Sequence, residues 1–148
     1  MSDIGPAGRA TVMVCITCRD AAQRLNAETP GVEAPAVDAP GVEMLRAGMV
    51  LAGATASAAA AVSGVCVQRI RCLGNCSRGP SAAIRCDNSW TYIFGGLEPD
   101  RDANALVTGA QLLARAADGI MPWRGRPESL KRGLIARVPP ADFREELT

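Results

Sequence analysis

The sequence predicts an α/β fold in which a central mixed sheet of about four strands is flanked by helices. Two observations lead to this prediction. Short runs rich in β-branched residues are interspersed with two longer segments of helical character. A length of 148 residues with 48% apolar residues is sufficient for one hydrophobic core. We therefore expect a single domain that spans residues 1–148.

The first half of the chain predicts a strand, a loop and a helix. Residues 9–17 (RATVMVCIT) form an apolar, β-branched run that places Cys15 and Cys18 at its carboxyl end. Residues 26–41 contain three prolines among small and acidic residues, which is typical of a flexible surface loop. An alanine-rich segment, residues 42–61, then predicts a helix. The expected apolar face of this helix consists of Val42, Leu45, Met49, Ala52 and Ala56.

The second half predicts three further strands and the clearest helix of the chain. Residues 64–71 (GVCVQRIR) alternate as a strand does and lead directly into Cys72. Residues 81–86 and 90–95 form a hairpin around the sequence CDNS. Residues 98–119 predict a helix that Gly119 ends, with a buried stripe of Ala103, Leu106, Val107, Ala110 and Leu113. A Pro- and Arg-rich tail, residues 120–148, follows with one short helix from Pro127.

This order of elements is that of a thioredoxin-like fold. A helix connects two parallel strands, a hairpin follows, and the last long helix packs against the sheet. The two parallel strands end at the same edge of the sheet. The fold therefore predicts that Cys15 and Cys18, after the first strand, lie near Cys72 and Cys76, after the second strand.

Composition narrows the classes of function. The formal net charge of +1 argues against general nucleic-acid binding, and no segment has the length and apolarity of a signal peptide or a membrane span. We therefore expect a cytoplasmic protein without nucleic-acid or membrane partners. Six cysteines in such a protein require an explanation other than disulfides. The absence of histidine excludes Cys-His zinc fingers, Rieske ligation and Ser-His or Cys-His catalysis.

The spacing of the four cysteines favours an iron-sulfur cluster over its alternatives. Cys15, Cys18, Cys72 and Cys76 supply four thiolates, and the glycines of the turn CLGNCSRGP can direct backbone N–H groups toward sulfur. Zinc ribbons instead have two C-x2-C pairs close together, whereas residues 19–71 lie between these pairs. Zinc or cobalt on the same thiolates, and a redox-active dithiol at CITC, remain alternatives.

The two other cysteines are expected to be core residues. Cys66 and Cys86 alternate with small or apolar residues in predicted strands, and a buried free cysteine behaves as a small hydrophobe. Cys66 is also a substitute candidate for the fourth ligand in place of Cys18.

The motif CLGNCSRGPSAAI resembles the second cysteine pair of thioredoxin-like [2Fe-2S] ferredoxins and of the related subunit of respiratory NADH dehydrogenase. The wider pattern, with VCITCRD and DGIMPWRGRPESLKRGLIARVPP, resembles small predicted metal-binding proteins encoded near cobalamin-biosynthesis genes. The resemblance implies that Cys72, Cys76 and Cys15 are cluster ligands. The ferredoxins space their first two ligands more widely than C-x2-C, so Cys18 departs from their pattern.

The resemblance implies a function and partners. It predicts a one-electron carrier rather than an enzyme, a [2Fe-2S] cofactor, a homodimer, and electron donation to a reductive step of cobalamin biosynthesis. The partners expected are redox proteins. A run of cations in the tail can attract an acidic redox partner and speed its encounter; it consists of Arg124, Arg126, Lys131, Arg132 and Arg137.

Overall fold

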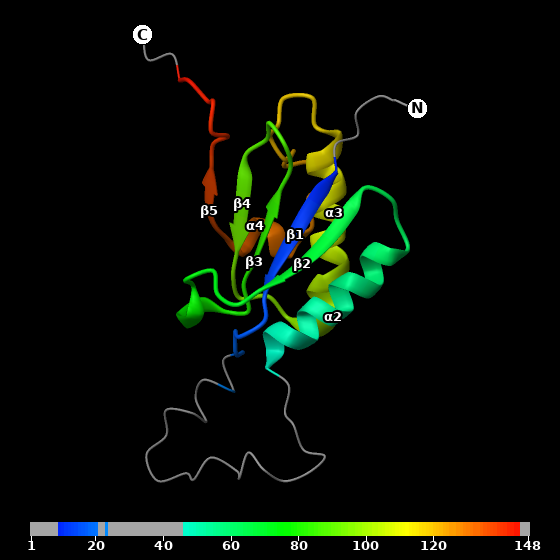
Figure 1. Cartoon of the computed structure of the whole chain (residues 1–148), viewed down its shortest axis with the longest axis vertical. Helices are drawn as coiled ribbons and strands as arrows, with labels where there is room; N and C mark the ends of the chain where they lie inside the picture. Colours follow the sequence, from blue (N-terminus) through cyan, green and yellow to red (C-terminus); the bar gives the residue numbers. More distant parts are fainter. Residues whose placement is uncertain (1–8, 21–22, 24–45, 146–148) are drawn as a thin grey trace.

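The computed structural model describes residues 9–20, 23 and 46–145. Within these residues the elements follow one another as drawn in Figure 1. The predicted loop 26–41 and the start of the first predicted helix, residues 42–45, lie outside the described residues. The elements are β1 (Ala10–Cys15), α2 (Ala47–Ala60), β2 (Val65–Ile70), the 3-10 helix η1 (Cys76–Arg78), β3 (Ala82–Arg85), β4 (Thr91–Phe94), α3 (Pro99–Arg115), α4 (Glu128–Arg132) and β5 (Leu134–Val138).

The strands form one mixed sheet in the order β2-β1-β3-β4-β5. β1 and β2 run parallel, and Cys15 at the end of β1 lies opposite Ile70 at the end of β2. The pairs β1–β3, β3–β4 and β4–β5 are antiparallel. The sequence predicts these features: a parallel pair of strands, a helix that connects them and a hairpin that follows. Because the structure has all three, the predicted thioredoxin-like α/β fold is confirmed.

The fifth strand corrects the prediction of about four strands. β5 pairs with β4, and Leu134 lies opposite Phe94. The short helix predicted near Pro127 is α4, in which Leu130 is completely buried. The segment after residue 120 is therefore not simply a tail, because it contributes an edge strand to the sheet and a leucine to the core.

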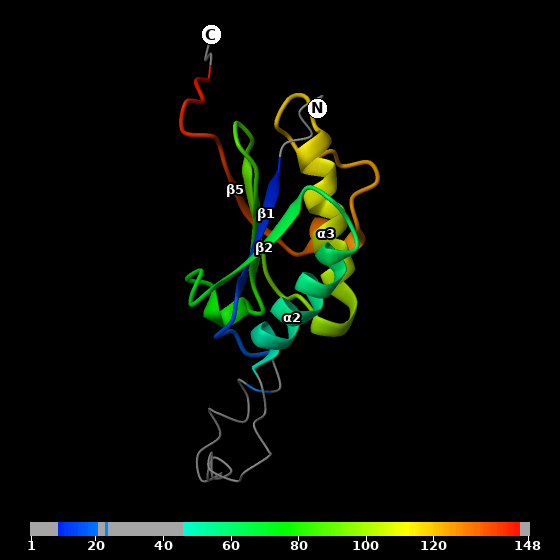
Figure 2. The same cartoon turned by 45° about the vertical axis from the view of Figure 1, so that its right-hand side comes forward.

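The two long helices lie side by side on one face of the sheet (Figure 2). α3 packs against β1 and β3, and α2 packs against β1 and β2. α3 ends at Arg115, before the predicted end at Gly119. The predicted stripe of α3 is confirmed, since each of its members is buried: Ala103, Leu106, Val107, Ala110 and Leu113. None of the helices in the described part of the chain has the length and apolar character needed to span a bilayer.

The buried face of α2 differs from the predicted one. Of the expected face, Ala52 is buried, whereas Met49 and Ala56 are half-buried. The helix sequence AGMVLAGATASAAA has almost no contrast between polar and apolar positions, so periodicity does not identify the inner face. The contacts with α3 and the sheet determine it instead, and the buried residues are Ala47, Gly48, Leu51, Ala52, Thr55 and Ala59.

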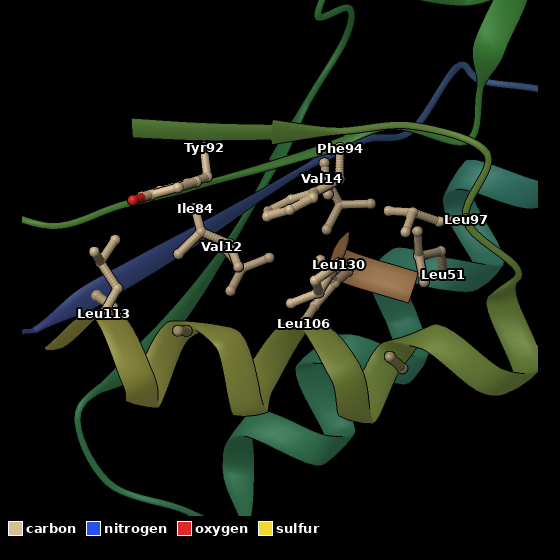
Figure 3. Packing of buried hydrophobic residues seen from close by; sticks show 14 of the residues in the cluster. Val12, Val14, Leu51, Ile84, Tyr92, Phe94, Leu97, Leu106, Leu113 and Leu130 are labelled. Carbon is tan, nitrogen blue, oxygen red and sulfur yellow. The ribbon is translucent and has the colours of Figure 1, made fainter. Parts of the chain in front are cut away.

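The core lies between the sheet and the helices, as Figure 3 shows. Side chains of β1, β3 and β4 point toward α3 in this view, and Leu51 of α2 completes the layer. Tyr92 and Phe94 of β4 are almost fully buried, with ring centroids 6.4 Å apart. The Tyr92 hydroxyl accepts a hydrogen bond of 2.9 Å from the Met121 backbone N–H, which satisfies its buried oxygen. Burial of each large side chain stabilises the fold by about 1.5–3 kcal/mol.

Arg126 departs from the prediction that the cations of the tail attract an acidic redox partner. Only 8% of it is exposed, and its guanidinium donates hydrogen bonds to the carbonyl oxygens of Met121 and Pro122. The guanidinium carbon also lies 5.4 Å from the centre of the Tyr92 ring. Burial lowers the pKa of Arg126. This arginine therefore closes one end of the core rather than facing a partner.

Candidate metal centre

The first cysteine pair lies at the carboxyl end of β1 and is buried. Cys15 is the last residue of the strand and is 1% exposed, and Cys18 in the following turn is 2% exposed. Cys15 Sγ lies 3.4 Å from the carbonyl oxygen of Arg71, to which it donates a hydrogen bond. Because Arg71 directly follows β2, this contact connects the ends of the two parallel strands.

The second pair lies in the segment after β2 and is exposed. The sulfurs of Cys72 and Cys76 are 3.8 Å apart. The backbone N–H of Gly74 donates a hydrogen bond of 3.1 Å to Cys72 Sγ. Gly74 has a φ of 75°, a backbone conformation that glycine adopts readily, so this residue type allows the turn. An N–H group directed at sulfur stabilises negative charge on a thiolate, as the sequence predicts for this turn.

The two pairs are neighbours, but their sulfurs do not form one group. Cys15 Sγ donates a hydrogen bond to the carbonyl oxygen of Arg71, the residue directly before Cys72. Across the described ranges, however, no three Cys, Asp or Glu side chains are close enough together to hold a metal ion. The structure thus brings both predicted pairs to one end of the sheet (the lower end in Figure 1) as two separate pairs.

The environment of the buried pair affects its two thiols in opposite directions. Burial and the hydrogen bond with Cys15 raise the pKa of Cys18 to about 11. Burial also acts to raise the pKa of Cys15, but hydrogen bonds from Cys18, Thr17 and the Leu73 backbone outweigh it and lower this pKa. In the exposed pair, the adjacent Cys72 sulfur raises the pKa of Cys76. The lowered pKa makes Cys15 the thiol of the buried pair that ionises first.

Two glycines hold the buried pair in place: Gly79, one of the glycines of the turn CLGNCSRGP, and Gly48, which the sequence did not single out as a site residue. A Cβ atom at Gly79 would lie 2.8 Å from Cys18 Sγ, so a larger residue would displace this sulfur. A Cβ atom at Gly48 would overlap the carbonyl oxygen of Cys15. Gly48 also donates a backbone hydrogen bond of 2.9 Å to the Cys18 carbonyl. The first turn of α2 therefore packs directly on the turn between the two cysteines.

The residues at this end of the sheet fit a thiolate-ligated centre in their chemistry. The donors are four sulfurs, Gly79 leaves room for one of them, and the Gly74 N–H already points at another. Assembly of one centre would require the exposed Cys72–Cys76 segment to move closer to Cys15 and Cys18.

The two remaining cysteines lie away from this end. Cys66 pairs in register with Thr11, near the start of β1, whereas Cys15 is at its end. Cys86 follows Arg85, which also pairs with Thr11. Both cysteines are half-buried, and Cys86 packs against the hydrophobic core. Burial raises the pKa of Cys86. In this geometry Cys66 does not reach the Cys72–Cys76 segment as a substitute for Cys18.

The sequence itself matches a known family. Residues 12–140 match the family described as a protein of unknown function, DUF1636. The chain belongs to this family. The matched segment of this DUF1636 protein includes both cysteine pairs, both long helices, the strands β2 to β5 and all of β1 except its first two residues. Among curated proteins, none matches the chain.

Among solved structures, this DUF1636 protein is similar to a thioredoxin-like [2Fe-2S] ferredoxin from Aquifex aeolicus. The two share 16% sequence identity with a TM-score of 0.49, and the similarity covers 92% of this chain and 99% of that chain.

Proposed function

We propose that this DUF1636 protein is a one-electron carrier that holds a [2Fe-2S] cluster on Cys15, Cys18, Cys72 and Cys76. The observation that carries the proposal is the juxtaposition of two cysteine pairs at the ends of two parallel strands. Four thiols in a chain that contains no histidine form a ligand set made only of sulfur. Sulfur ligands of this kind suit iron-sulfur clusters.

The residues around the two pairs have distinct tasks in this proposal. Gly48 and Gly79 fix the buried pair in position, because backbone or sulfur atoms occupy the space that a Cβ would need. The Gly74 N–H donates to Cys72 Sγ, which favours the charged thiolate that a metal requires. Cys72 and Cys76 are exposed, so this side of the centre is accessible to a redox partner. The cluster, when bound, supplies reversible uptake and release of one electron.

The charges beside the pairs support a role in encounter with a negatively charged partner. Arg71 and Arg78 flank the exposed cysteines, and both are exposed. Cations at such a position accelerate association with an acidic redox protein. Three expectations stay predictions from the sequence. They are an acidic redox partner, electron donation to a reductive step of cobalamin biosynthesis, and a homodimer.

Metal and sulfide analysis tests the proposal. The full chain is produced and purified without oxygen, and its iron, acid-labile sulfide and zinc are quantified per chain. The proposal predicts two iron ions and two sulfides per chain, with a visible absorption band that bleaches on addition of dithionite. A colourless chain with stoichiometric zinc or cobalt and no sulfide would contradict electron transfer and favour a metal-handling function. A chain that binds no metal but oxidises reversibly within one pair, Cys15–Cys18 of CITC or Cys72–Cys76, would favour a dithiol.

A further inference from the structure

A hollow of about 490 Å³ lies next to the candidate metal centre. Three segments that are far apart in the sequence line it: η1 with Gly79, the connection from β4 to α3, and the α4–β5 turn. Three arginines contribute to its wall, Arg78, Arg101 and Arg132, together with one acidic residue, Glu98. A cavity of this size accommodates a small molecule.

The backbone of the hollow is closely packed around glycines. The Gly95 N–H donates a hydrogen bond of 2.8 Å to the Gly133 carbonyl, and the Gly96 N–H donates one of 2.6 Å to the Arg78 carbonyl. A Cβ atom at Gly95 would lie 2.7 Å from the Arg78 carbonyl oxygen. Backbone contacts thus hold the three segments at fixed positions relative to one another. The hollow is therefore a formed feature of the fold rather than a gap between unconnected loops.

The cationic residues of the hollow are only partly compensated. The guanidinium of Arg101 is 3.6 Å from the Glu98 carboxylate and 3.3 Å from the carboxylate of Asp102, which is buried. Within the described residues, by contrast, neither Arg78 nor Arg132 has an ion-pair partner. The wall therefore presents two uncompensated guanidinium groups from two different segments.

We propose that this hollow binds the phosphate group of a small phosphate monoester. A phosphate monoester carries about two negative charges at neutral pH, which matches the two uncompensated guanidinium groups. Arginine binds phosphate oxygens through a planar fork of N–H donors. Arg78 in η1 and Arg132 in α4 line the hollow from separate segments, and Ser129 also contributes to its wall. Donors from several directions suit a tetrahedral group, and the volume leaves space for the rest of the molecule.

The proposal does not depend on a bound cluster, because none of its donors is a cysteine. Its test therefore uses the full chain as purified and reads out ligand binding alone. A two-dimensional ¹H–¹⁵N NMR titration is carried out with inorganic phosphate, with glycerol 1-phosphate and with chloride at matched ionic strength. Saturable shifts are expected for the amides of Gly95, Gly96 and Gly133 with both phosphate compounds and not with chloride.

Substitutions distinguish a site from general attraction to a cation. Arg78→Gln and Arg132→Gln should each weaken binding by at least about tenfold, since each removes charged hydrogen bonds. Arg124→Gln is the matched control, because Arg124 is an exposed arginine that does not line the hollow, and it should bind as the unmodified chain does. Tighter binding of glycerol 1-phosphate than of inorganic phosphate supports a monoester. Equal affinity for the two compounds supports a phosphate subsite and overturns the assignment of a phosphate monoester as the ligand. Shifts scattered over many arginines, or unchanged binding in both variants, would overturn the site.

Discussion

Cys15 Sγ lies 3.4 Å from the carbonyl oxygen of Arg71, the residue that connects β2 to the segment containing Cys72. This contact joins two parts of the chain that the entire β1–α2–β2 connection separates. It exists because β1 and β2 are parallel and end in register, Cys15 opposite Ile70. The position of the candidate metal centre is therefore a direct consequence of the strand order.

Single replacements of the cysteines should separate ligands from core residues. The chain should lose most of its bound iron when any one of the four proposed thiolate ligands is removed. The four substitutions are Cys15→Ser, Cys18→Ser, Cys72→Ser and Cys76→Ser. Iron per chain after anaerobic purification measures the effect.

Cys66→Ser and Cys86→Ser serve as the matched controls and should retain iron. They also replace a thiol, but at positions beside the start of β1, whereas Cys15 lies at the end of this strand. Loss of iron in Cys66→Ser together with retention in Cys18→Ser would reassign the fourth ligand.

The two cysteine pairs of the metal-free chain should react with alkylating reagents at very different rates. Cys72 and Cys76 are exposed, whereas Cys15 and Cys18 are 1% and 2% exposed. Alkylation of the buried pair requires local opening, so its rate should follow the stability of the chain. Mass spectrometry after timed exposure to iodoacetamide under native conditions measures each site. Equally fast labelling of Cys15 and Cys72 would show that the buried pair is not enclosed.

Gly79→Ala should destabilise the chain by about 1–3 kcal/mol, the usual cost of adding a methyl group to a packed site. The added Cβ would lie 2.8 Å from Cys18 Sγ, and Cys18 is too enclosed to move away freely. Urea unfolding of the metal-free chain measures the change in free energy. The same substitution should also reduce iron binding, because it displaces a proposed ligand.

Gly53→Ala is the matched control for this substitution. Gly53 lies within α2, and apart from its chain neighbours and the backbone of its own helix no atom lies within 4 Å of its added Cβ. Alanine should therefore stabilise the helix there by about 0.5–1 kcal/mol. A neutral effect at position 79 would show that Cys18 does not require the space beside this glycine.

Stability should decrease at alkaline pH in part through Cys86. Burial raises the pKa of Cys86 in the folded chain, so the folded state retains this proton more strongly than the unfolded state does. The contribution of Cys86 to the free energy of unfolding is fully present below about pH 8.5, the pKa of an unperturbed cysteine. It is lost as the pH rises through the pKa of Cys86 in the folded chain.

Denaturant unfolding between about pH 8 and pH 10.5 measures this dependence. Cys86→Ala and Cys86→Ser both remove the titrating group, so both should have a shallower decrease in stability than the unmodified chain. Their stabilities at neutral pH can differ, because the two side chains pack differently. A steeper decrease in either variant would contradict the raised pKa.

Much of the sheet could be predicted because its strands have distinctive sequences. β1 is rich in β-branched residues, β4 combines β-branched with aromatic residues, and both strands were located from sequence. β5 was missed, since its five residues lie in a Pro- and Arg-rich segment and their extended conformation comes from pairing with β4. The inner face of α2 was predicted only in part, because a helix in which half of the residues are alanine offers almost no contrast between its sides.

The location of the candidate site was predictable, but its internal arrangement was not. Strand order indicated that Cys15 and Cys72 would lie at the same end of the sheet, and they do. The roles of Gly48 and Gly79 depend on close approaches between segments distant in sequence, which no local pattern encodes. The separation of the buried pair from the exposed pair likewise follows from the path of the segment after β2.

Electron paramagnetic resonance of the dithionite-reduced chain, purified without oxygen, tests the central claim most directly. A [2Fe-2S] cluster that accepts one electron has one unpaired spin in its reduced form, and none in its oxidised form. The account predicts a signal that appears on reduction, integrates to about one spin per chain, and is absent from Cys72→Ser but present in Cys86→Ser. A chain that is silent in both states while carrying stoichiometric zinc would contradict the account.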